Sequence, residues 1–89
     1  MALIKKKIIV KNEQGLHARP AALFVQIANK FDSRITVSRG EEEVNGKSIM
    51  GILMLGAEKG SSILIEADGA DAQAAIEELA KVITLEEDL

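Results

Sequence analysis

The stretch RITVSRGEEEVNG, residues 34–46, decides the fold. Ile35 and Val37 alternate with polar residues, which predicts a strand with one buried face. Arg39-Gly40 is typical of a hairpin turn, and Glu42 to Val44 is the predicted return strand. The three glutamates before Val44 indicate an exposed edge, because charges on an edge strand resist pairing with other chains. Such short strands joined by a tight turn predict an antiparallel sheet.

Two further strands are predicted on either side of this hairpin. In residues 4–10 and 63–67, apolar side chains recur at every second position, with Lys6 the one imperfection in the first segment. The residues from Asn12 to Gly15 are turn-like and separate the first strand from the first predicted helix.

Three helices are predicted between and after the strands. The first opens near His17–Pro20 and ends at Asp32-Ser33, with apolar residues spaced three and four apart. The second is the apolar segment Ile49–Leu55, and Asp71 is a favourable N-cap for a third helix that runs to Ile83.

The predicted order of elements is strand, helix, strand, strand, helix, strand, helix. We expect an α+β fold in which a four-stranded antiparallel sheet carries the three helices on one face. A chain of 89 residues is below the usual size of one domain, about 100–200 residues, so residues 1–89 are expected to form a single domain.

Composition excludes several classes of function. The chain has 11 basic and 14 acidic side chains and a net charge of −3, which argues against a general nucleic-acid binder. It has no cysteine and one histidine, so thiolate chemistry, thiolate metal centres and multi-histidine metal sites are excluded. No apolar run is long enough for a membrane span or a signal-peptide core, so we expect a cytoplasmic protein without membrane insertion.

His17 stands where the first helix begins. If it is the N-cap, Pro20 is the third helical residue and the first N–H groups without an intrahelical partner are those of Ala18 and Arg19. A helix N-terminus carries about half a positive elementary charge, which favours an anion such as a phosphoryl group on the ring. Arg19 adds a permanent charge able to hold phosphate oxygens. From position alone, however, a single histidine beside a turn is more often a surface residue or a cap.

The segment Ile49–Leu55 is apolar nearly all round. A two-turn helix on a small domain cannot bury every face, so part of the segment faces water or a partner. Methionine suits a surface that meets several partners, because its side chain is flexible and polarisable. The candidate docking residues are Ile49, Met50, Leu53 and Met54. The alternative is that these side chains only fill the core.

Two blocks of sequence resemble one family. Gly15-Leu16-His17-Ala18-Arg19-Pro20-Ala21-Ala22 resembles the active-site signature of HPr, the histidine-containing phosphocarrier of the bacterial phosphotransferase system. The block from Lys47 to Gly56 resembles the region around the regulatory serine of that family. The resemblance covers nearly all of the chain, in the same order.

The resemblance implies an open-faced sandwich and a carrier that is not a turnover enzyme and needs no cofactor. His17 would accept a phosphoryl group on Nδ1 from phosphorylated enzyme I and pass it to a sugar-specific enzyme IIA, while Arg19 would steady the group. Ser48 would be the target of an HPr kinase/phosphorylase where one exists, and a transcription regulator would be a further partner. Ala22 and Leu23 would join the docking surface. A monomer is expected, because transient partners need the His17 face free.

Two other functions remain compatible with the sequence. A regulatory protein of the nitrogen-related branch would share His17 and differ in its partners. A plain interaction module of similar topology would carry an inert histidine, and Ser48 would then only cap the short helix.

Overall fold

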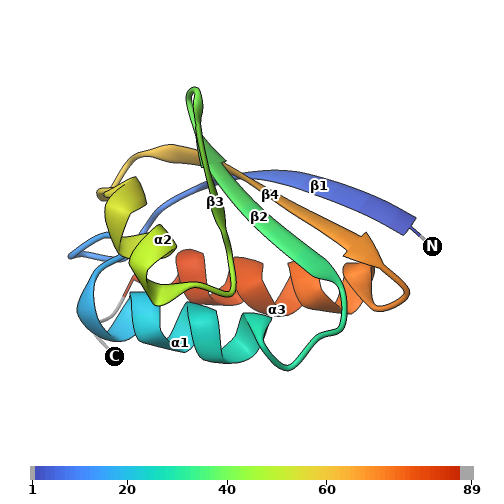
Figure 1. Ribbon diagram of the computed structural model, residues 1–89. Coiled ribbons are helices and arrows are strands. Elements are labelled where there is room, and N and C mark those ends of the chain that lie inside the picture. Colours follow the sequence, from blue (N-terminus) through green and yellow to red (C-terminus); the bar gives the residue numbers. More distant parts are fainter. Residues whose placement is uncertain (1, 87–89) are drawn as a thin grey trace.

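The computed structural model of the protein describes residues 2–86. Seven elements follow one another in the predicted order (Figure 1). Their bounds are β1 Ala2–Ile9, α1 Ala18–Ala28, β2 Arg34–Arg39, β3 Glu42–Asn45, α2 Ile49–Leu55, β4 Ser62–Gly69 and α3 Ala72–Ile83.

The four strands form one sheet in the order β1-β4-β2-β3, and every neighbouring pair is antiparallel. The predicted antiparallel sheet is therefore confirmed. The inner strand β4 lies between β1 and β2, and it places Ile63 opposite Ile8 of β1 and Ile65 opposite Val37 of β2. This register stacks the apolar positions of three strands on one face of the sheet, as their two-residue period requires.

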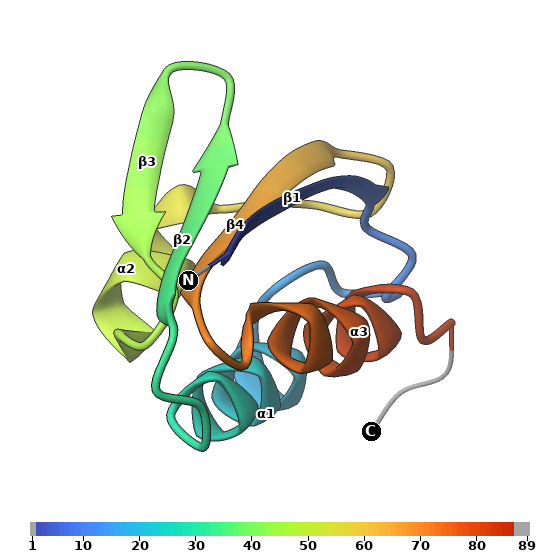
Figure 2. The same ribbon diagram turned by 90° about the vertical axis from the view of Figure 1, so that its right-hand side faces the viewer.

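All three helices lie on that face and leave the other face open (Figure 2). Helix α3 packs beneath β1 and β4, α1 packs beside α3, and α2 sits against β3. Large, fully buried side chains from both layers form one core: Leu16, Phe24, Ile35, Val37, Ile52, Leu55, Ile63, Ile65, Ile76, Leu79 and Ile83. The open-faced α+β sandwich expected for this chain is thus confirmed.

The strands predicted at residues 4–10 and 63–67 have bounds that differ by one or two residues from the observed β1 and β4, and two further boundaries differ. Helix α1 ends at Ala28, before the predicted stop at Asp32-Ser33. The Asn29 side chain donates hydrogen bonds to the carbonyl oxygens of Val25 and Lys47, which ties the helix end to the segment before α2. The β2–β3 turn is Gly40-Glu41 rather than Arg39-Gly40, because Arg39 already pairs with Glu42 in the ladder.

Asp71 also behaves differently from the prediction. It occupies the N-cap position of α3, but its side chain makes no capping hydrogen bond within the described part of the chain. Its carboxylate instead accepts hydrogen bonds from the backbone N–H groups of Asp32 and Ser33 and from the Ser33 hydroxyl. The Ser33 hydroxyl and the Asp32 amide lower the pKa of Asp71. Asp71 therefore fastens the start of α3 to the loop between α1 and β2.

We expect the Asp71→Asn variant to melt at a lower temperature than the natural chain at neutral pH. The lowered pKa means that the folded state holds the Asp71 carboxylate more tightly than the unfolded state does. That contribution is present above the unfolded pKa and is lost as the pH falls through the folded pKa. The difference in melting temperature should therefore shrink between pH 7 and about pH 3. A difference independent of pH over this range, measured by circular dichroism, would contradict the assignment.

Within residues 2–86, no helix combines the length and the apolar character that crossing a bilayer requires.

Candidate functional site

The segment before α1 is held from both sides. The N–H of Leu16 donates to the carbonyl oxygen of Ala57 at 2.8 Å, and the Leu16 side chain is fully buried. Asn12 is also buried, and its amide nitrogen donates to the carbonyl oxygens of Val82 and Leu85 at 2.9 Å each. Residues 12–16 therefore connect the end of α3 to Ala57, two residues after the end of α2, and they fix the place at which α1 begins.

Gly15 makes this connection possible. Its φ of +72° lies in the left-handed region, and its N–H donates to the carbonyl oxygen of Asn12 at 3.0 Å. A Cβ atom at this position would lie 2.4 Å from the carbonyl oxygen of Ala57 and 2.9 Å from the Cα of Glu58. Both the backbone conformation and the close approach of the 57–58 segment thus require glycine.

His17 is the N-cap of α1, with extended backbone angles (φ −128°, ψ 165°). Its carbonyl oxygen accepts from the N–H of Ala21 at 3.5 Å, and Pro20 is the third residue of the helix. Its half-buried side chain makes no capping hydrogen bond to α1 within the described residues. Capping does not occupy the ring nitrogens, so the imidazole can serve as an acceptor at the helix N-terminus.

Ala18 is a feature that the sequence analysis missed. Its φ of +49° makes it the one residue other than glycine with a left-handed backbone between residues 2 and 86. This conformation costs an L-residue about 1–2 kcal/mol, and such strain is concentrated at functional sites. Ala18 directly follows His17, so the strained backbone conformation lies at the first residue of α1, directly after the N-cap residue. Arg19, the next residue, is exposed at the surface.

Helix α2 lies beside this point. Its last residue, Leu55, is followed by Gly56 in the left-handed conformation and by Ala57, the partner of Leu16. The hydrogen bond between Ala57 and Leu16 therefore brings the end of α2 near the start of α1, and the two helices also contact each other directly. His17 and the apolar helix share one side of the molecule.

The prediction that α2 cannot bury all its faces is confirmed. Ile52 and Leu55 enter the core, whereas four side chains stay exposed: Met54 at 72%, Met50 at 64%, Ile49 at 41% and Leu53 at 38%. We call these four residues the α2 face. Of the two residues predicted to join it from α1, Ala22 is exposed, while Leu23 is half-buried and packs against the core.

Ser48 is the N-cap of α2. Its hydroxyl oxygen accepts a hydrogen bond from the N–H of Gly51 at 3.1 Å, as expected for a capping serine. Gly51 in turn lets α2 approach β3, because a Cβ there would lie 3.2 Å from the carbonyl oxygen of Asn45 and from the Val44 side chain. The half-buried Ser48 thus stands at the positive end of the helix and directly precedes Ile49 of the α2 face.

The described residues contain no group of three or more histidine, cysteine, aspartate or glutamate side chains that could hold a metal ion.

The family model for the phosphorylation site of the HPr component of the phosphotransferase system matches residues 4–84. Phosphocarrier protein HPr of Neisseria meningitidis serogroup A is 44% identical over 81 residues, which cover 91% of each chain. The HPr-like protein Crh of Bacillus subtilis is 42% identical over 81 residues, covering 91% of this chain and 95% of Crh. The crystal structure of an HPr from Bacillus anthracis has a TM-score of 0.89 and 46% identity, covering 93% of this chain and 99% of that one. The chain belongs to the HPr family of the phosphotransferase system.

The expectation of a monomer needs correction. An HPr dimer from Thermoanaerobacter tengcongensis matches with a TM-score of 0.73 and 51% identity, covering 85% of this chain and 87% of that one. Crh of Bacillus subtilis, with 42% identity and a TM-score of 0.75, forms a swapped, intertwined dimer in its crystal structure. Members of this family thus form dimers, and a free His17 face is no argument for a monomer.

Proposed function

We propose that this protein is a phosphoryl carrier whose acceptor is Nδ1 of His17. In this proposal a bond forms between the phosphorus atom and Nδ1 of His17, while the bond that holds the phosphoryl group to enzyme I breaks. The group then passes to a histidine of a sugar-specific enzyme IIA, which regenerates the free ring. The observation that carries the proposal is the position of His17, the one histidine of the chain, at the N-cap of α1 with its ring not used for capping.

The start of α1 suits both states of such a carrier. The first-turn N–H groups of a helix have no intrahelical partners, and the helix end carries about half a positive elementary charge. A phosphoryl group on His17 would lie near the amides of Ala18 and Arg19, and it would gain stabilisation from them and from the Arg19 guanidinium. In this scheme the chain is a carrier and not an enzyme. It accepts the phosphoryl group in one transfer and donates it in the next.

The α2 face supplies the surface on which enzyme I and enzyme IIA would dock. Its two methionines are its most exposed side chains, and methionine adapts to partners of different shape. The C-terminal end of α2 lies near the start of α1, because Ala57 accepts a hydrogen bond from Leu16, the residue before His17. Ala22 extends the surface onto α1, with a smaller share from Leu23.

The direct test is to incubate the chain with enzyme I and phosphoenolpyruvate and to measure its mass. A carrier gains one phosphoryl group that is lost in acid, as expected for a phosphorus–nitrogen bond. Adding an enzyme IIA should then return the chain to its original mass. An unchanged mass with an enzyme I that modifies another HPr would instead support the interaction module with an inert histidine. Measuring phosphoryl transfer with sugar-specific partners and with nitrogen-related partners shows to which of the two branches of the family the chain belongs.

We expect the Met54→Glu variant to lose about tenfold in the rate of phosphoryl transfer from enzyme I, with little change in melting temperature. Met54 is 72% exposed, so the substitution costs little folding energy, whereas a partner that covers it would have to desolvate the new charge. Gln73→Glu, on an exposed position of α3, is the matched control and should transfer at the natural rate. Equal rates for the two variants would exclude Met54 from the docking surface.

We further propose regulation at Ser48. An HPr kinase/phosphorylase, where the organism has one, would phosphorylate its hydroxyl, and the product would be recognised by a transcription regulator. The support is the place of Ser48 between the helix N-terminus and the α2 face, together with the resemblance of the block from Lys47 to Gly56 to the region around the family's regulatory serine. A phosphate at this helix end is compatible with the fold, because its negative charge is attracted by the positive N-terminal end of the helix dipole. The same charge beside Ile49 and Met50 would hinder docking.

We expect Ser48→Asp and Ser48→Ala to separate these two roles. Aspartate caps a helix as well as serine does, so Ser48→Asp should keep its melting temperature and lower the rate of transfer from enzyme I by about tenfold. Alanine removes the cap, so Ser48→Ala should lose about 1 kcal/mol of stability and about 4–8 °C in melting temperature but transfer normally. If Ser48→Asp melts lower and transfers at the natural rate, Ser48 acts only as a cap.

A further inference from the structure

The β1 edge of the sheet is open along residues 3–9. β1 is the outermost strand on its side of the sheet, and no further described strand lies beyond it (Figure 2). A groove of about 500 Å³ lies between this edge and α3, with Ile8 and Ile9 among its residues on the strand side and Ala80 on the helix side. The backbone of β1 can therefore be approached from the side, although α3 packs beneath the strand.

The outward-facing backbone groups of β1 belong to its odd-numbered residues. The N–H of Val10 donates to the carbonyl oxygen of Ser61, which directly precedes β4, whereas the N–H of Lys11 donates away from β4 to the carbonyl oxygen of Ile83. In an antiparallel ladder, successive residues direct their N–H and C=O groups to alternate sides. The groups of residues 3, 5, 7 and 9 therefore face the open edge, where one more strand can pair with them.

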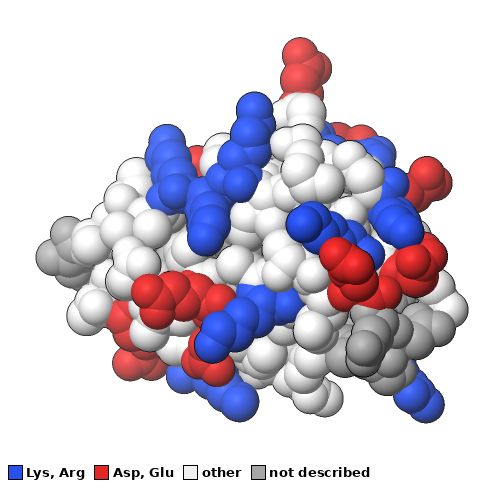
Figure 3. All heavy atoms as spheres, turned by 180° about the vertical axis from the view of Figure 1, so that it is seen from behind, with Lys and Arg blue, Asp and Glu red and all other residues white. Residues whose placement is uncertain are grey.

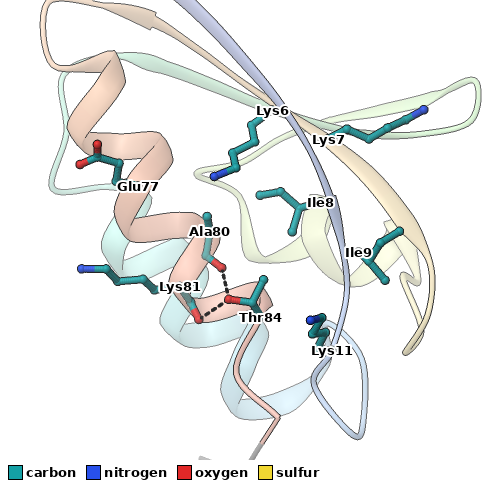
Figure 4. Close-up of a pocket in the computed structure, with 9 residues that line it drawn as sticks. All are labelled: Lys6, Lys7, Ile8, Ile9, Lys11, Glu77, Ala80, Lys81 and Thr84. Atoms are coloured by element: carbon teal, nitrogen blue, oxygen red, sulfur yellow. Dashed lines mark hydrogen bonds between the residues drawn. The ribbon is translucent and has the colours of Figure 1, made fainter.

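Four exposed lysines line the groove: Lys6, Lys7, Lys11 and Lys81. Within residues 2–86 their ammonium groups form no ion pair and no hydrogen bond. Glu77, also in the lining, accepts a hydrogen bond from Gln73 and points away from the groove in Figure 4. From behind, lysine and arginine side chains gather on the part of the surface that β1 crosses (Figure 3). This side is thus positively charged, although the whole chain carries a net charge of −3.

Protection of an exposed edge explains only part of this charge. Lysines on an edge strand prevent its pairing with other chains, and residues 5–7 fit that role. Lys11 and Lys81 lie outside β1, however, and they extend the charge along the groove. The same strand also exposes two large apolar side chains, Leu3 at 55% and Ile9 at 48%. Repulsion of other chains needs neither feature, whereas both fit an edge that a partner covers.

The directions of the lysine side chains favour an extended ligand over a compact one. In Figure 4, Lys6 extends from β1 towards α3, whereas Lys7 and Lys81 point away from the groove on opposite sides. A compact anion such as phosphate cannot contact ammonium groups that diverge in this way. An extended chain that lies along β1 passes between them and also reaches the backbone groups of the open edge.

The sequence pattern of such a partner follows from β1. Residues directly opposite each other in neighbouring strands place their side chains on the same face, where opposite charges attract. Lys5, Lys6 and Lys7 therefore favour three successive acidic residues in the partner. Residues 3–4 and 8–9 of β1 are leucine or isoleucine, so apolar residues should flank the acidic ones. Lys5 already lies 3.5 Å from Glu66 of β4, which leaves Lys6 and Lys7 with the unpaired charge.

We propose that the β1 edge binds an extended acidic segment of another protein, which pairs with β1 as a fifth strand of the sheet. The contact along residues 3–9 spans about 20 Å. It is small for a protein interface, so the dissociation constant is on the order of 0.1 mM at low ionic strength. β1 and β3 are the opposite edges of the sheet, and α2 sits against β3. The segment therefore leaves the α2 face free.

The test is an NMR titration of the isotope-labelled full chain with the peptide acetyl-Gly-Val-Val-Glu-Glu-Glu-Val-Val-Gly-amide, whose symmetrical pattern fits β1 in either direction. At 1 mM peptide we expect hydrogen exchange of the amides of residues 3, 5, 7 and 9 to slow by about tenfold, because these N–H groups gain a partner. The amides of residues 4, 6 and 8 already face β4 and should change little. Unchanged spectra overturn the proposal, and so do shifts without slower exchange at the odd-numbered residues.

Two further titrations test other occupants of the edge. Tripolyphosphate at 1 mM should leave exchange at residues 3, 5, 7 and 9 unchanged, since a compact anion offers no strand. Raising the concentration of the natural chain to about 1 mM without peptide should also leave it unchanged. Slower exchange in the first case would assign the groove to a small anion, and in the second to another copy of the chain. Either result overturns the proposal.

Charge reversal tests the lysines. The variant K6E/K7E should bind the peptide at least about tenfold more weakly than the natural chain, and a peptide with glutamine in place of glutamate should show the same loss. The control K30E/K59E changes the net charge equally at exposed lysines outside the groove, and it should bind like the natural chain. Equal binding by K6E/K7E and K30E/K59E would overturn the proposal.

A proline variant separates backbone pairing from charge. Lys7→Pro removes an outward-facing N–H without removing a hydrogen bond to β4, a place where an edge strand tolerates proline. Compared with Lys7→Ala, which removes only the charge, Lys7→Pro should bind the peptide several-fold more weakly. Equal binding of the two, with circular dichroism showing both folded, excludes strand pairing.

The proposal does not depend on the phosphoryl-carrier function, and one measurement keeps the two apart. Saturating peptide should leave the rate of phosphoryl transfer from enzyme I unchanged, because the peptide and the α2 face use opposite edges of the sheet. A rate that falls as the peptide binds would place the peptide on the α2 face and overturn the assignment to β1. Slower exchange at the odd-numbered residues in a chain that accepts no phosphoryl group would contradict only the proposed function.

Discussion

The His17→Ala variant is expected to acquire no phosphoryl group from enzyme I and phosphoenolpyruvate, under conditions in which the natural chain is fully modified. The sequence has one histidine, so no second imidazole can replace it. The fold should be unaffected, because the His17 side chain is half-buried and makes no capping hydrogen bond among the described residues. Loss of the reaction would therefore reflect loss of the acceptor.

The readout distinguishes the acceptor from other sites. Mass spectrometry before and after brief acid treatment separates a phosphohistidine, which acid hydrolyses, from a phosphoserine, which survives. Lys59→Ala, at an exposed lysine that pairs with Glu13 on the surface, is a control that should be phosphorylated normally. If His17→Ala still gains one acid-labile phosphoryl group, His17 is not the acceptor and the proposed function is wrong.

The sheet and its helices could be predicted from the sequence because their signals are local. Alternation in residues 4–10, 34–38 and 63–67 matches the inward-facing positions of these segments, except that Ile4 is only half-buried and Lys6 is exposed. The short apolar helix and the Ser48 cap follow from the same kind of local pattern. The role of His17 depended on the likeness to a family, since its position alone fits a surface residue equally well.

The features that sequence analysis missed depend on contacts between distant residues. A carboxylate at an N-cap can bond to its own helix or to a neighbour, and Asp71 bonds to the loop at Ser33, 38 residues away. The end of α1 depends on Asn29, whose side chain also reaches Lys47. The left-handed backbone of Ala18 has no local signal, because alanine does not favour it. Such features become visible only when the chain is folded.

Gly15 is required both by its own positive φ and by its contact with the distant 57–58 segment, and its replacement should have the largest effect on stability. The Gly15→Ala variant is expected to lose about 2–4 kcal/mol, from the strain of a positive φ in an L-residue and from the overlap of its Cβ with the 57–58 backbone. In a domain of this size each kcal/mol corresponds to about 4–8 °C in melting temperature. Thermal unfolding followed by circular dichroism measures the loss.

A second glycine separates the two causes. Gly40 also has a positive φ, +62°, but a Cβ there would meet nothing within 4 Å among the described residues, so Gly40→Ala should lose only about 1–2 kcal/mol. The difference between the variants measures the close approach of Gly15 to Ala57. Because Leu16 and His17 directly follow Gly15, relief of the overlap must move the start of α1. We therefore expect Gly15→Ala, assayed well below its melting temperature, to accept phosphoryl groups about tenfold more slowly, and Gly40→Ala at the natural rate. Equal stability and equal rates for the two variants would show that the Ala57–Leu16 connection does not position His17.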